Sequence, residues 1–455
     1  MTIQQAMHQM PGKPGRDTAV RGEAPREASS DEAGSPRHAP NHTGSGLLQE
    51  ALTRENLQLA LKRVRSNKGV AGVDGLGIEE TIEHLKTAWP AIRAQLLAGT
   101  YRPSPVRRVL IPKPDGGERK LGIPTVTDRL IQQALLQVLQ PLLDPGFSDH
   151  SYGFRPGRNA HQAVLAAQQF VHTGRNIVVD VDLEQFFDRV DHDLLIARLS
   201  VKVTDRGVLR LVRAYLNSGT LIDGVVVGSD RGTPQGGPLS PLLANVLLDE
   251  VDKELERRGH CFVRYADDAN VYVRSLKAGQ RVMALLRRLY DRLRLQVNEC
   301  KSAVASAFGR KFLGYGFWLS VQGEVKRWVA SKALQAFKSR IRQLTPRNAG
   351  RSLSKVVEGL KGYLLGWKAY FGLSQTPRVM QRFDEWIRRR LRAIQLKQWK
   401  TGRNIYRELR KLGAVDELAS AVASNSHRLW YNSAGLIHGV LTVAWADRLG
   451  LPRLY

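Results

Sequence analysis

Two pairs of carboxylates stand where short apolar strands are predicted to end. They are Asp180 and Asp182 at the end of the β-branched run 177–183, and Asp267 and Asp268 at the turn of a hairpin formed by residues 261–265 and 270–273. Because side chains alternate along a strand, Asp180 and Asp182 point to the same face. Such carboxylates are costly to bring together unless a divalent cation neutralises them. The pattern therefore favours two-metal phosphoryl transfer, in which Mg²⁺ ions hold an attacking hydroxyl and a triphosphate in line.

A purely structural interpretation is also open for each motif. Asp182 could cap the helix that follows the strand, and Asp267 with Asp268 could form a polar turn. Either motif alone would leave the two interpretations nearly equal. Their presence together, in this order and between strands, favours the metal site.

The elements that must position these carboxylates form a mixed α and β region. The runs 107–113 and 120–123 are predicted strands around the turn 114–117, and residues 128–142 and 159–171 are predicted helices. With the hairpin at 261–273, an antiparallel core is expected.

After residue 330 the pattern predicts helices only. Apolar residues recur there every three or four positions, in three stripes: Leu334, Phe337, Ile341 and Leu344; Leu353, Val356, Val357, Leu360, Tyr363, Leu364, Trp367 and Tyr370; and Val379, Phe383, Trp386, Ile387, Leu391 and Ile394. Three such helices can bury their stripes against one another and present a basic outer surface. The Trp and Tyr residues are expected in this core rather than as platforms for bases.

The charge of the chain is concentrated in the same block. The whole chain of 455 residues holds 69 Lys and Arg against 42 Asp and Glu, a net charge of +27. Residues 326–412 hold 23 Lys and Arg against 4 Asp and Glu. Residues 1–46 are balanced, with five of each sign, and their Pro and Gly content predicts disorder. A surplus of this size implies a polyanionic partner, although a basic face kept for solubility is the alternative.

Composition excludes several other classes of protein. Two cysteines, Cys261 and Cys300, cannot build a disulfide scaffold or a cysteine-ligated zinc or iron–sulfur centre. No apolar run reaches the length of a membrane span, and the first residues lack the apolar core of a secretory signal. A cytoplasmic, nucleoid-associated protein with no membrane partner is expected.

Several ordered motifs resemble those of a known family. They are VVDVDLEQFF at 178–187 and YADD at 265–268, which resemble the metal boxes of reverse transcriptases, with IPKPDGGERKLGIPTVTDRLIQQAL at 111–135, SYGFRPGRNAHQAV at 151–164, RGTPQGGPLSPLLANVLLDEVD at 231–252, FLGYGF at 312–317 and GLKGYLLGWKAYFGL at 359–373. Their order is similar to that of the reverse transcriptase/maturase encoded by bacterial group II introns. The resemblance covers about residues 47–455.

The resemblance implies a role for each site residue. Asp182, Asp267 and Asp268 would hold two Mg²⁺ ions, with Mn²⁺ as an alternative. Asp180 is not part of the resemblance, and we expect it to lie beside the site as a supporting group. Lys301 would protonate the leaving pyrophosphate, unless it is an ordinary surface lysine. Lys113 and Arg119 would bind the triphosphate of the incoming nucleotide, and Gln235 would line the nucleotide pocket. The ring of Phe187 would lie beneath the sugar and exclude a 2′-hydroxyl, unless Phe187 is an ordinary core residue.

The resemblance also implies the fold class and the domains. The fold would be α+β, a right-hand polymerase whose fingers and palm contain an antiparallel sheet, followed by an all-α thumb. The expected parts are a disordered extension at 1–46, fingers and palm at 47–325, a maturase (thumb/X) domain at 326–400 and a small DNA-binding segment at 401–455. FLGYGF would hold the primer end. Many relatives carry a C-terminal endonuclease with His and Cys ligands, but no cysteine follows Cys300 here, so the endonuclease-lacking type is expected.

The function implied is that of an RNA-directed DNA polymerase, a nucleotidyltransferase. It would also bind its host group II intron RNA to promote splicing and retromobility by target-primed reverse transcription. Its partners would be the intron RNA, an RNA template, a DNA primer or target and dNTPs. Two alternatives remain open, an RNA-binding splicing factor without polymerase activity and a domesticated reverse transcriptase in DNA repair or phage defence. The sequence leaves the oligomeric state open.

Overall fold

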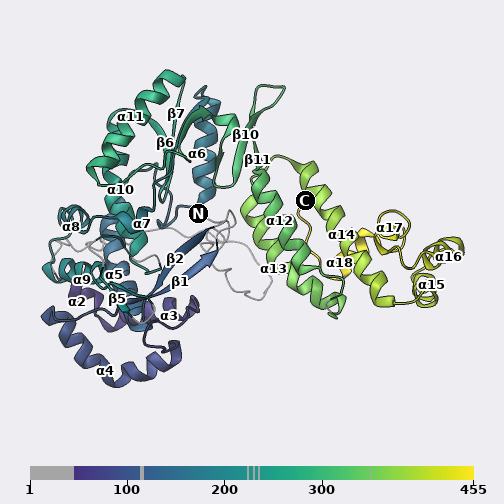
Figure 1. Cartoon of the computed structure of the whole chain (residues 1–455), viewed down its shortest axis with the longest axis horizontal. Coiled ribbons are helices and arrows are strands. Elements are labelled where there is room, and N and C mark those ends of the chain that lie inside the picture. The colour runs from purple at the N-terminus through teal and green to yellow at the C-terminus, as the bar shows by residue number, and fades with distance from the viewer. Residues whose placement is uncertain (1–45, 113–116, 223–224, 229–230, 234–235, 349) are drawn as a thin grey trace, which may run out of the picture. The chain divides into compact units, whose positions relative to one another are not determined.

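The computed structural model describes residues 46–112, 117–222, 225–228, 231–233, 236–348 and 350–455. These residues form two compact units (Figure 1). The sheet unit comprises residues 46–163 and 177–305, and the helical unit comprises residues 164–176 and 306–455. The α+β class is confirmed, with the larger sheets in the first unit and mostly helices in the second.

The sheet unit contains two four-stranded sheets, with strand orders β6-β7-β3-β8 and β2-β1-β4-β5. The strands of the first are β3 (Ile177–Val181), β6 (Cys261–Tyr265), β7 (Asp268–Val273) and β8 (Ala303–Ser306), and those of the second are β1 (Val106–Pro112), β2 (Glu118–Ile123), β4 (Thr220–Ile222) and β5 (Val225–Val227). The β1–β2 and β6–β7 hairpins and the β3–β7 pair are antiparallel, as the sequence predicted. Strands β4 and β5 were not predicted, because each is only three residues long.

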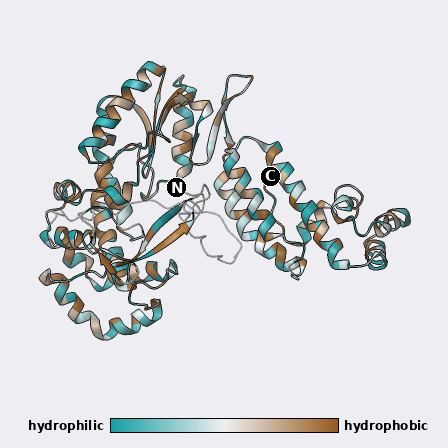
Figure 2. Ribbon diagram, viewed as in Figure 1, coloured by the Kyte–Doolittle hydropathy of each residue, from teal (hydrophilic) through white to brown (hydrophobic). Residues whose placement is uncertain are grey.

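The remaining elements of this unit are helices, and several of them begin at a capping residue. They are α2 (Leu47–Ala51), α3 (Arg54–Ser66), α4 (Ile78–Ala98), α5 (Val126–Leu143), η1 (Asp144–Gly146), α7 (Phe186–Arg189), α8 (His192–Ser200), α9 (Arg206–Leu216), α10 (Ser240–Arg257) and α11 (Leu276–Arg292). The side chains of Thr125, Asp191 and Ser275 each accept a hydrogen bond from the first turn of their helix. Helices α10 and α11 pack on the first sheet, and their apolar faces join one large core with it (Figure 2).

The helical unit begins with a small sheet and continues as helices. Its elements are η2 (Ala307–Gly309), β9 (Lys311–Phe312), β10 (Tyr315–Leu319), β11 (Val325–Val329), α12 (Ser331–Leu344), α13 (Leu353–Phe371), α14 (Pro377–Trp399), α15 (Gly402–Lys411), α16 (Asp416–Ser424), α17 (Leu429–Asn432) and α18 (Val443–Arg448). The predicted stripes meet in its core, where the ring centroid of Trp367 lies 4.4 Å from that of Phe337 and 4.7 Å from that of Phe371. Trp367 is 2% exposed, as expected of a core residue.

The expected domain bounds at 325 and 400 stay predictions, since the two compact units reflect packing alone. Helix α6 (Ala160–His172) packs largely with the helical unit, because Gln168 accepts from Arg327 and donates to the carbonyl of Val325. The segment after residue 400 packs on α14, where the buried Arg392 donates to the carbonyl of Leu441. Among the described residues, no helix is long and apolar enough to cross a membrane.

Candidate active site

The β6–β7 hairpin and β3 bring the predicted carboxylates to one end of the first sheet. Tyr265 pairs with Asp268, so that the hairpin turns in only two residues, Ala266 and Asp267. The turn is tighter than predicted, and Asp268 begins β7 instead of lying in the loop. The β3–β7 register pairs Val181 with Ala269, and one further step places Asp182 opposite Asp268.

Asp182 is held by the chain that precedes β8. Its backbone N–H donates to Ser302 Oγ at 3.0 Å, and its carbonyl accepts from the backbone N–H of Asn298 at 2.8 Å. Lys301 Nζ lies 3.5 Å from Asp182 Oδ2, while 62% of the lysine side chain stays exposed. The structure therefore brings the predicted lysine beside a predicted metal ligand, with its amine accessible.

The electrostatics of this end of the sheet are those of crowded acids. Burial, with repulsion from Asp267 and then from Asp182 and Asp180, raises the pKa of Asp268 from its ordinary 3.8 to about 7. A buried carboxylate beside like charges holds a proton unless a cation replaces it. Asp180 is opposite Asn270 in the β3–β7 register. In the orientation of the Asn270 side-chain amide that satisfies its hydrogen bonds, the amide nitrogen donates to Asp180 Oδ1 at 2.9 Å.

These oxygen ligands suit a hard divalent cation such as Mg²⁺. As they stand, no three His, Cys, Asp or Glu side chains in the described part of the chain are gathered closely enough to hold a metal ion. A cation would therefore have to draw Asp182, Asp267 and Asp268 together. Burial and repulsion between these acids disfavour the ionised form of Asp268, and a bound cation would offset both effects.

Phe187 lies beside the start of the glycine-rich loop, the segment 231–239 before α10, of which the structure describes residues 231–233 and 236–239. Its carbonyl accepts from the backbone N–H of Thr233 at 2.6 Å, and its half-buried ring contacts Phe186 edge-on at a centroid distance of 5.1 Å. A Cβ on Gly232 would lie 3.0 Å from the same carbonyl, so the loop approaches the backbone here more closely than most residues would allow. Both the sugar-selecting role and the ordinary core role of Phe187 remain compatible with this position.

The second sheet also meets the glycine-rich loop. A Cβ on Gly236 would lie 2.5 Å from the carbonyl oxygen of Gly122 in β2, three residues beyond Arg119. Arg119 is half-buried and pairs with Ile111 of β1. Lys113 and Gln235, the other predicted nucleotide-binding residues, lie outside the described residues.

Sequence reasoning missed the buried His192 at the start of α8. Its Nε2 lies 2.7 Å from the carbonyl of Gly232, and its Nδ1 lies 3.1 Å from Asn217 Oδ1. It therefore supports the loop that carries the predicted pocket residue. A lone histidine in an ordinary helix gives no sequence signal of this contact.

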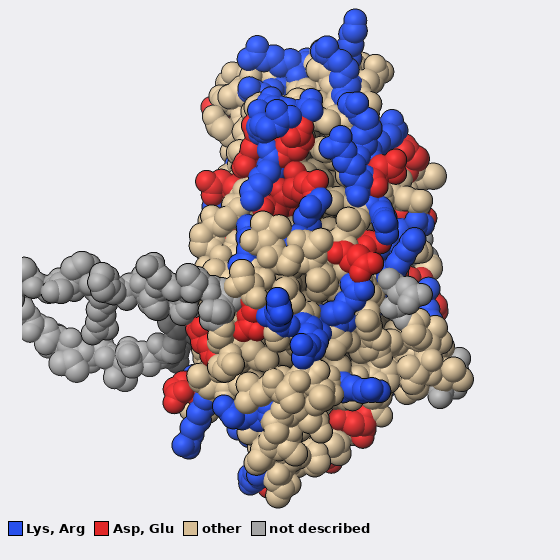
Figure 3. All heavy atoms as spheres, turned by 90° about the vertical axis from the view of Figure 1, so that its left-hand side faces the viewer, with Lys and Arg blue, Asp and Glu red and all other residues tan. Residues whose placement is uncertain are grey.

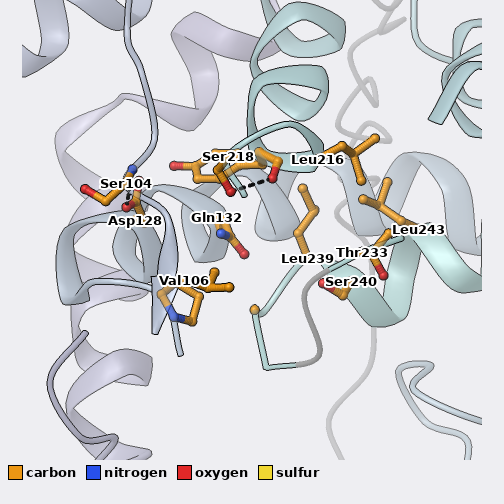
Figure 4. Close-up of a pocket in the computed structure, with 13 residues that line it drawn as sticks. Ser104, Val106, Asp128, Gln132, Leu216, Ser218, Thr233, Leu239, Ser240 and Leu243 are labelled. Carbon is orange, nitrogen blue, oxygen red and sulfur yellow. Dashed lines mark hydrogen bonds between the residues drawn. The ribbon is translucent and has the colours of Figure 1, made fainter. Parts of the chain in front are cut away.

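A small cavity lies between α5, α9 and α10 (Figure 4). It has a volume of about 20 Å³, room for about one water molecule, and its lining includes the buried Asp128. That carboxylate accepts from Thr125 Oγ1 at 2.7 Å, Tyr101 OH at 2.9 Å and the backbone N–H of Ser104 at 3.2 Å. Burial raises the pKa of Asp128. The cavity is too small for a nucleotide. Its lining includes Thr233 and Gly237, so the residues around it pack against the glycine-rich loop.

The two units differ in how their cations are used. In the sheet unit, cations of α8, α10 and α11 are paired with acids, among them Arg198 with Glu250 at 2.7 Å and Lys253 with Asp249 at 2.6 Å, and Figure 3 shows the two signs interspersed. In the helical unit acids are few, and the buried Asp384 accepts from the backbone N–H of Leu454 at 3.0 Å. Most cations of the basic block are exposed, and few acids lie among the described residues of the same unit.

Two family models match the chain. Residues 111–317 match "Reverse transcriptase (RNA-dependent DNA polymerase)", and residues 334–413 match "Group II intron, maturase-specific domain". The first model contains every carboxylate of the site, and the second contains most of the basic block.

Several curated relatives are similar to the chain over the first of these regions. Protein YkfC of Escherichia coli K12 is 36% identical over 218 residues, which cover 47% of this chain and 57% of that protein. The group II intron-encoded protein LtrA of Lactococcus lactis is 39% identical over 197 residues, covering 43% of this chain and 32% of LtrA. The retron Mx65 reverse transcriptase of Myxococcus xanthus is 31% identical over 211 residues, covering 43% and 46%. The chain thus spans about half of these relatives' length or less.

Proposed function

We propose that the chain is a group II intron-encoded reverse transcriptase, an RNA-directed DNA polymerase that also binds intron RNA. The observation that carries the proposal is the β3–β7 register. Its last pair, Val181 with Ala269, brings Asp182 to the end of the sheet that holds Asp267 and Asp268. Three acids at one end of a sheet have no other evident use, since they repel one another without a cation.

In this proposal each of these residues of the sheet unit has its own role in nucleotidyl transfer. Asp182, Asp267 and Asp268 hold Mg²⁺, which when bound activates the primer hydroxyl and neutralises the triphosphate. Lys301 donates a proton to the departing pyrophosphate, and its exposed amine beside Asp182 supports that role. Phe187 excludes a 2′-hydroxyl, while Arg119, Lys113 and Gln235 bind the incoming nucleotide.

Primer extension tests the polymerase activity. Purified protein should add dNTPs to a DNA primer on an RNA template in Mg²⁺, and Asp267→Ala should lose this activity. Asp291→Ala, which removes an exposed acid of α11, serves as the control. A protein that binds RNA but never extends the primer would instead be a splicing factor. Full activity in Asp267→Ala would refute the metal assignment.

The basic helical block supports the second half of the proposal. A folded intron RNA offers far more phosphate than a short template–primer duplex, and the surplus of cations in residues 326–412 suits the larger partner. The match of residues 334–413 to the maturase model favours intron RNA over the partner of a domesticated enzyme. We further propose that this binding promotes splicing, and that the same protein carries out target-primed reverse transcription, with residues 401–455 contacting DNA.

Splicing of the RNA that surrounds the reading frame tests the maturase role. At low Mg²⁺, where the ribozyme fold is weak, excision should require the protein. Asp267→Ala should still promote it, since the polymerase site is not needed for RNA folding. Equal splicing with and without protein would contradict the maturase role while leaving the polymerase activity untouched.

A further inference from the structure

A buried ion pair lies directly behind the catalytic turn. Arg264, the last residue but one of β6, is 1% exposed and so is its partner Asp252 in α10. The guanidinium Nε donates to both carboxylate oxygens of Asp252 at 2.9 Å, and Nη2 donates to Oδ2 at 2.5 Å. Both side chains are buried, and the mechanism proposed above does not use them.

The same guanidinium also holds the turn itself. Arg264 Nη1 donates to the carbonyl oxygen of Ala266 at 2.9 Å and to Asn245 Oδ1 at 2.8 Å. Asn245 in turn donates from Nδ2 to the carbonyl of Gly153 at 2.9 Å. One side chain thus links a helix, a strand and a loop to the first residue of the two-residue turn.

The turn needs such support because its backbone is strained. Ala266 has a φ of 59°, in the left-handed region that a residue with a Cβ rarely adopts. The loop at residues 150–153 packs tightly against it, since a Cβ on Gly153 would lie 2.3 Å from the Ala266 nitrogen. Backbone hydrogen bonds from Tyr152 N–H to the Arg264 carbonyl and from Arg264 N–H to the His150 carbonyl, each 2.9 Å, fix that loop along β6.

Stability alone is a weak reason for this arrangement. Removing two charges from water costs several kcal/mol per ion, and replacing a buried ion pair with apolar residues of similar volume is often neutral or stabilising. What an apolar pair cannot do is donate to the Ala266 carbonyl. The network is therefore better suited to fixing the conformation of the turn than to raising the stability of the fold.

We propose that Arg264, oriented by Asp252 and Asn245, is a positioning residue that sets the Ala266–Asp267 turn so that Asp267 and Asp268 can share divalent cations. The proposal rests on the proposed polymerase function. Asp267 and Asp268 follow Ala266 directly, so the conformation of the turn sets where their carboxylates lie relative to Asp182. A displaced turn should therefore raise the Mg²⁺ concentration that the site needs.

The double variant Arg264→Met/Asp252→Leu tests the proposal. It keeps the buried volume and removes both charges, but it loses the hydrogen bond to Ala266. We expect a melting temperature within a few degrees of the parent, a half-saturating Mg²⁺ concentration raised about 10-fold or more, and kcat lowered about 10–100-fold with little change in KM for dNTP. Direct Mn²⁺ binding to the protein, measured without nucleic acid, should weaken in parallel.

Three further variants keep the test decisive. Arg264→Lys retains the charge but cannot donate to Asp252, Asn245 and Ala266 at once, so its Mg²⁺ requirement should be intermediate. If the double variant does not fold, Asn245→Ser takes its place, because it keeps the ion pair and shortens the side chain that orients Arg264. Its half-saturating Mg²⁺ concentration should then rise. Arg392→Met removes a buried arginine that donates to a carbonyl in the helical unit, and it should leave Mg²⁺ dependence unchanged.

The outcomes separate the two proposals. A parent protein that never extends a primer and does not bind Mn²⁺ would refute the polymerase function. A parent that does both, with folded variants whose Mg²⁺ and Mn²⁺ dependence matches it, would overturn the role of Arg264. A loss of stability with unchanged metal dependence would show that the ion pair only supports the fold.

Discussion

Asp268 is a predicted metal ligand whose burial beside other acids destabilises the folded protein when it is ionised. Its pKa of about 7 means that the folded protein binds this proton more tightly than the unfolded chain does. Without metal, stability should therefore fall as the pH rises from about 4 to 7, and the full penalty of the ionised form remains above that range.

Asp268→Asn should remove this pH dependence. In EDTA at pH 8 we expect the variant to melt several degrees higher than the parent, while near pH 4 the two should be similar. Thermal unfolding followed across pH makes the comparison. The variant should also lose primer extension, because it lacks a metal ligand. If the melting temperatures of the parent and of Asp268→Asn change with pH in the same way, the raised pKa of Asp268 is wrong.

Lys301 carries the second prediction at the level of single residues. If it protonates pyrophosphate, Lys301→Gln should lower kcat about 100-fold with KM for dNTP nearly unchanged, and Lys301→Arg should lower it less. Steady-state primer extension measures both constants. Lys277→Gln, an exposed lysine of α11, is the control. An unchanged kcat in Lys301→Gln would make this an ordinary surface lysine.

At the scale of elements, the glycine-rich loop depends on close backbone contacts. Gly236 has a φ of 135°, and a Cβ there would collide with the Gly122 carbonyl of β2. Gly236→Ala should therefore displace the loop, raise KM for dNTP about 10-fold and lower the melting temperature. Gly228→Ala, with nothing within 4 Å of the added Cβ, should leave both unchanged. Equal KM values in the two variants would show that the loop does not line the nucleotide site.

Sequence patterns predicted the elements that carry the carboxylates because those signals are local. The alternation around Asp180 and Asp182, and the apolar runs either side of Asp267, predicted the strand and the hairpin whose pairing the structure confirms. The support of the turn could not be predicted, since Arg264, Asn245 and Gly153 meet only through tertiary packing. A buried arginine at an inward strand position contradicts the apolar pattern, and that exception was the available signal.

At the scale of the whole molecule, the charge is divided between a nearly balanced sheet unit and a basic helical unit. RNA binding should accordingly be steeply salt-dependent and should depend on the helical unit. The variant Lys355→Gln/Lys361→Gln/Arg378→Gln/Arg382→Gln removes four exposed cations from α13 and α14. If all four contact phosphates, the slope of log affinity against log salt should fall by about 3.

A matched control changes the same charge in the sheet unit. Arg65, Lys86, Arg213 and Arg287 are each already paired with an acid, so replacing them with Gln should alter the slope much less. Affinity measured at several salt concentrations with the surrounding RNA gives both slopes. Equal losses in the two variants would mean that the partner responds to net charge rather than to the helical unit.

The central claim is that Asp182, Asp267 and Asp268 hold divalent cations at the end of the β3–β7 pair. Fe²⁺ can replace Mg²⁺ in such sites and, with ascorbate and peroxide, cleaves the nearby backbone. We predict cleavage next to residue 182 and in the turn at 266–268, suppressed by excess Mg²⁺ and absent in Asp267→Ala. Cleavage elsewhere, or the same cleavage in Asp267→Ala, would contradict the account.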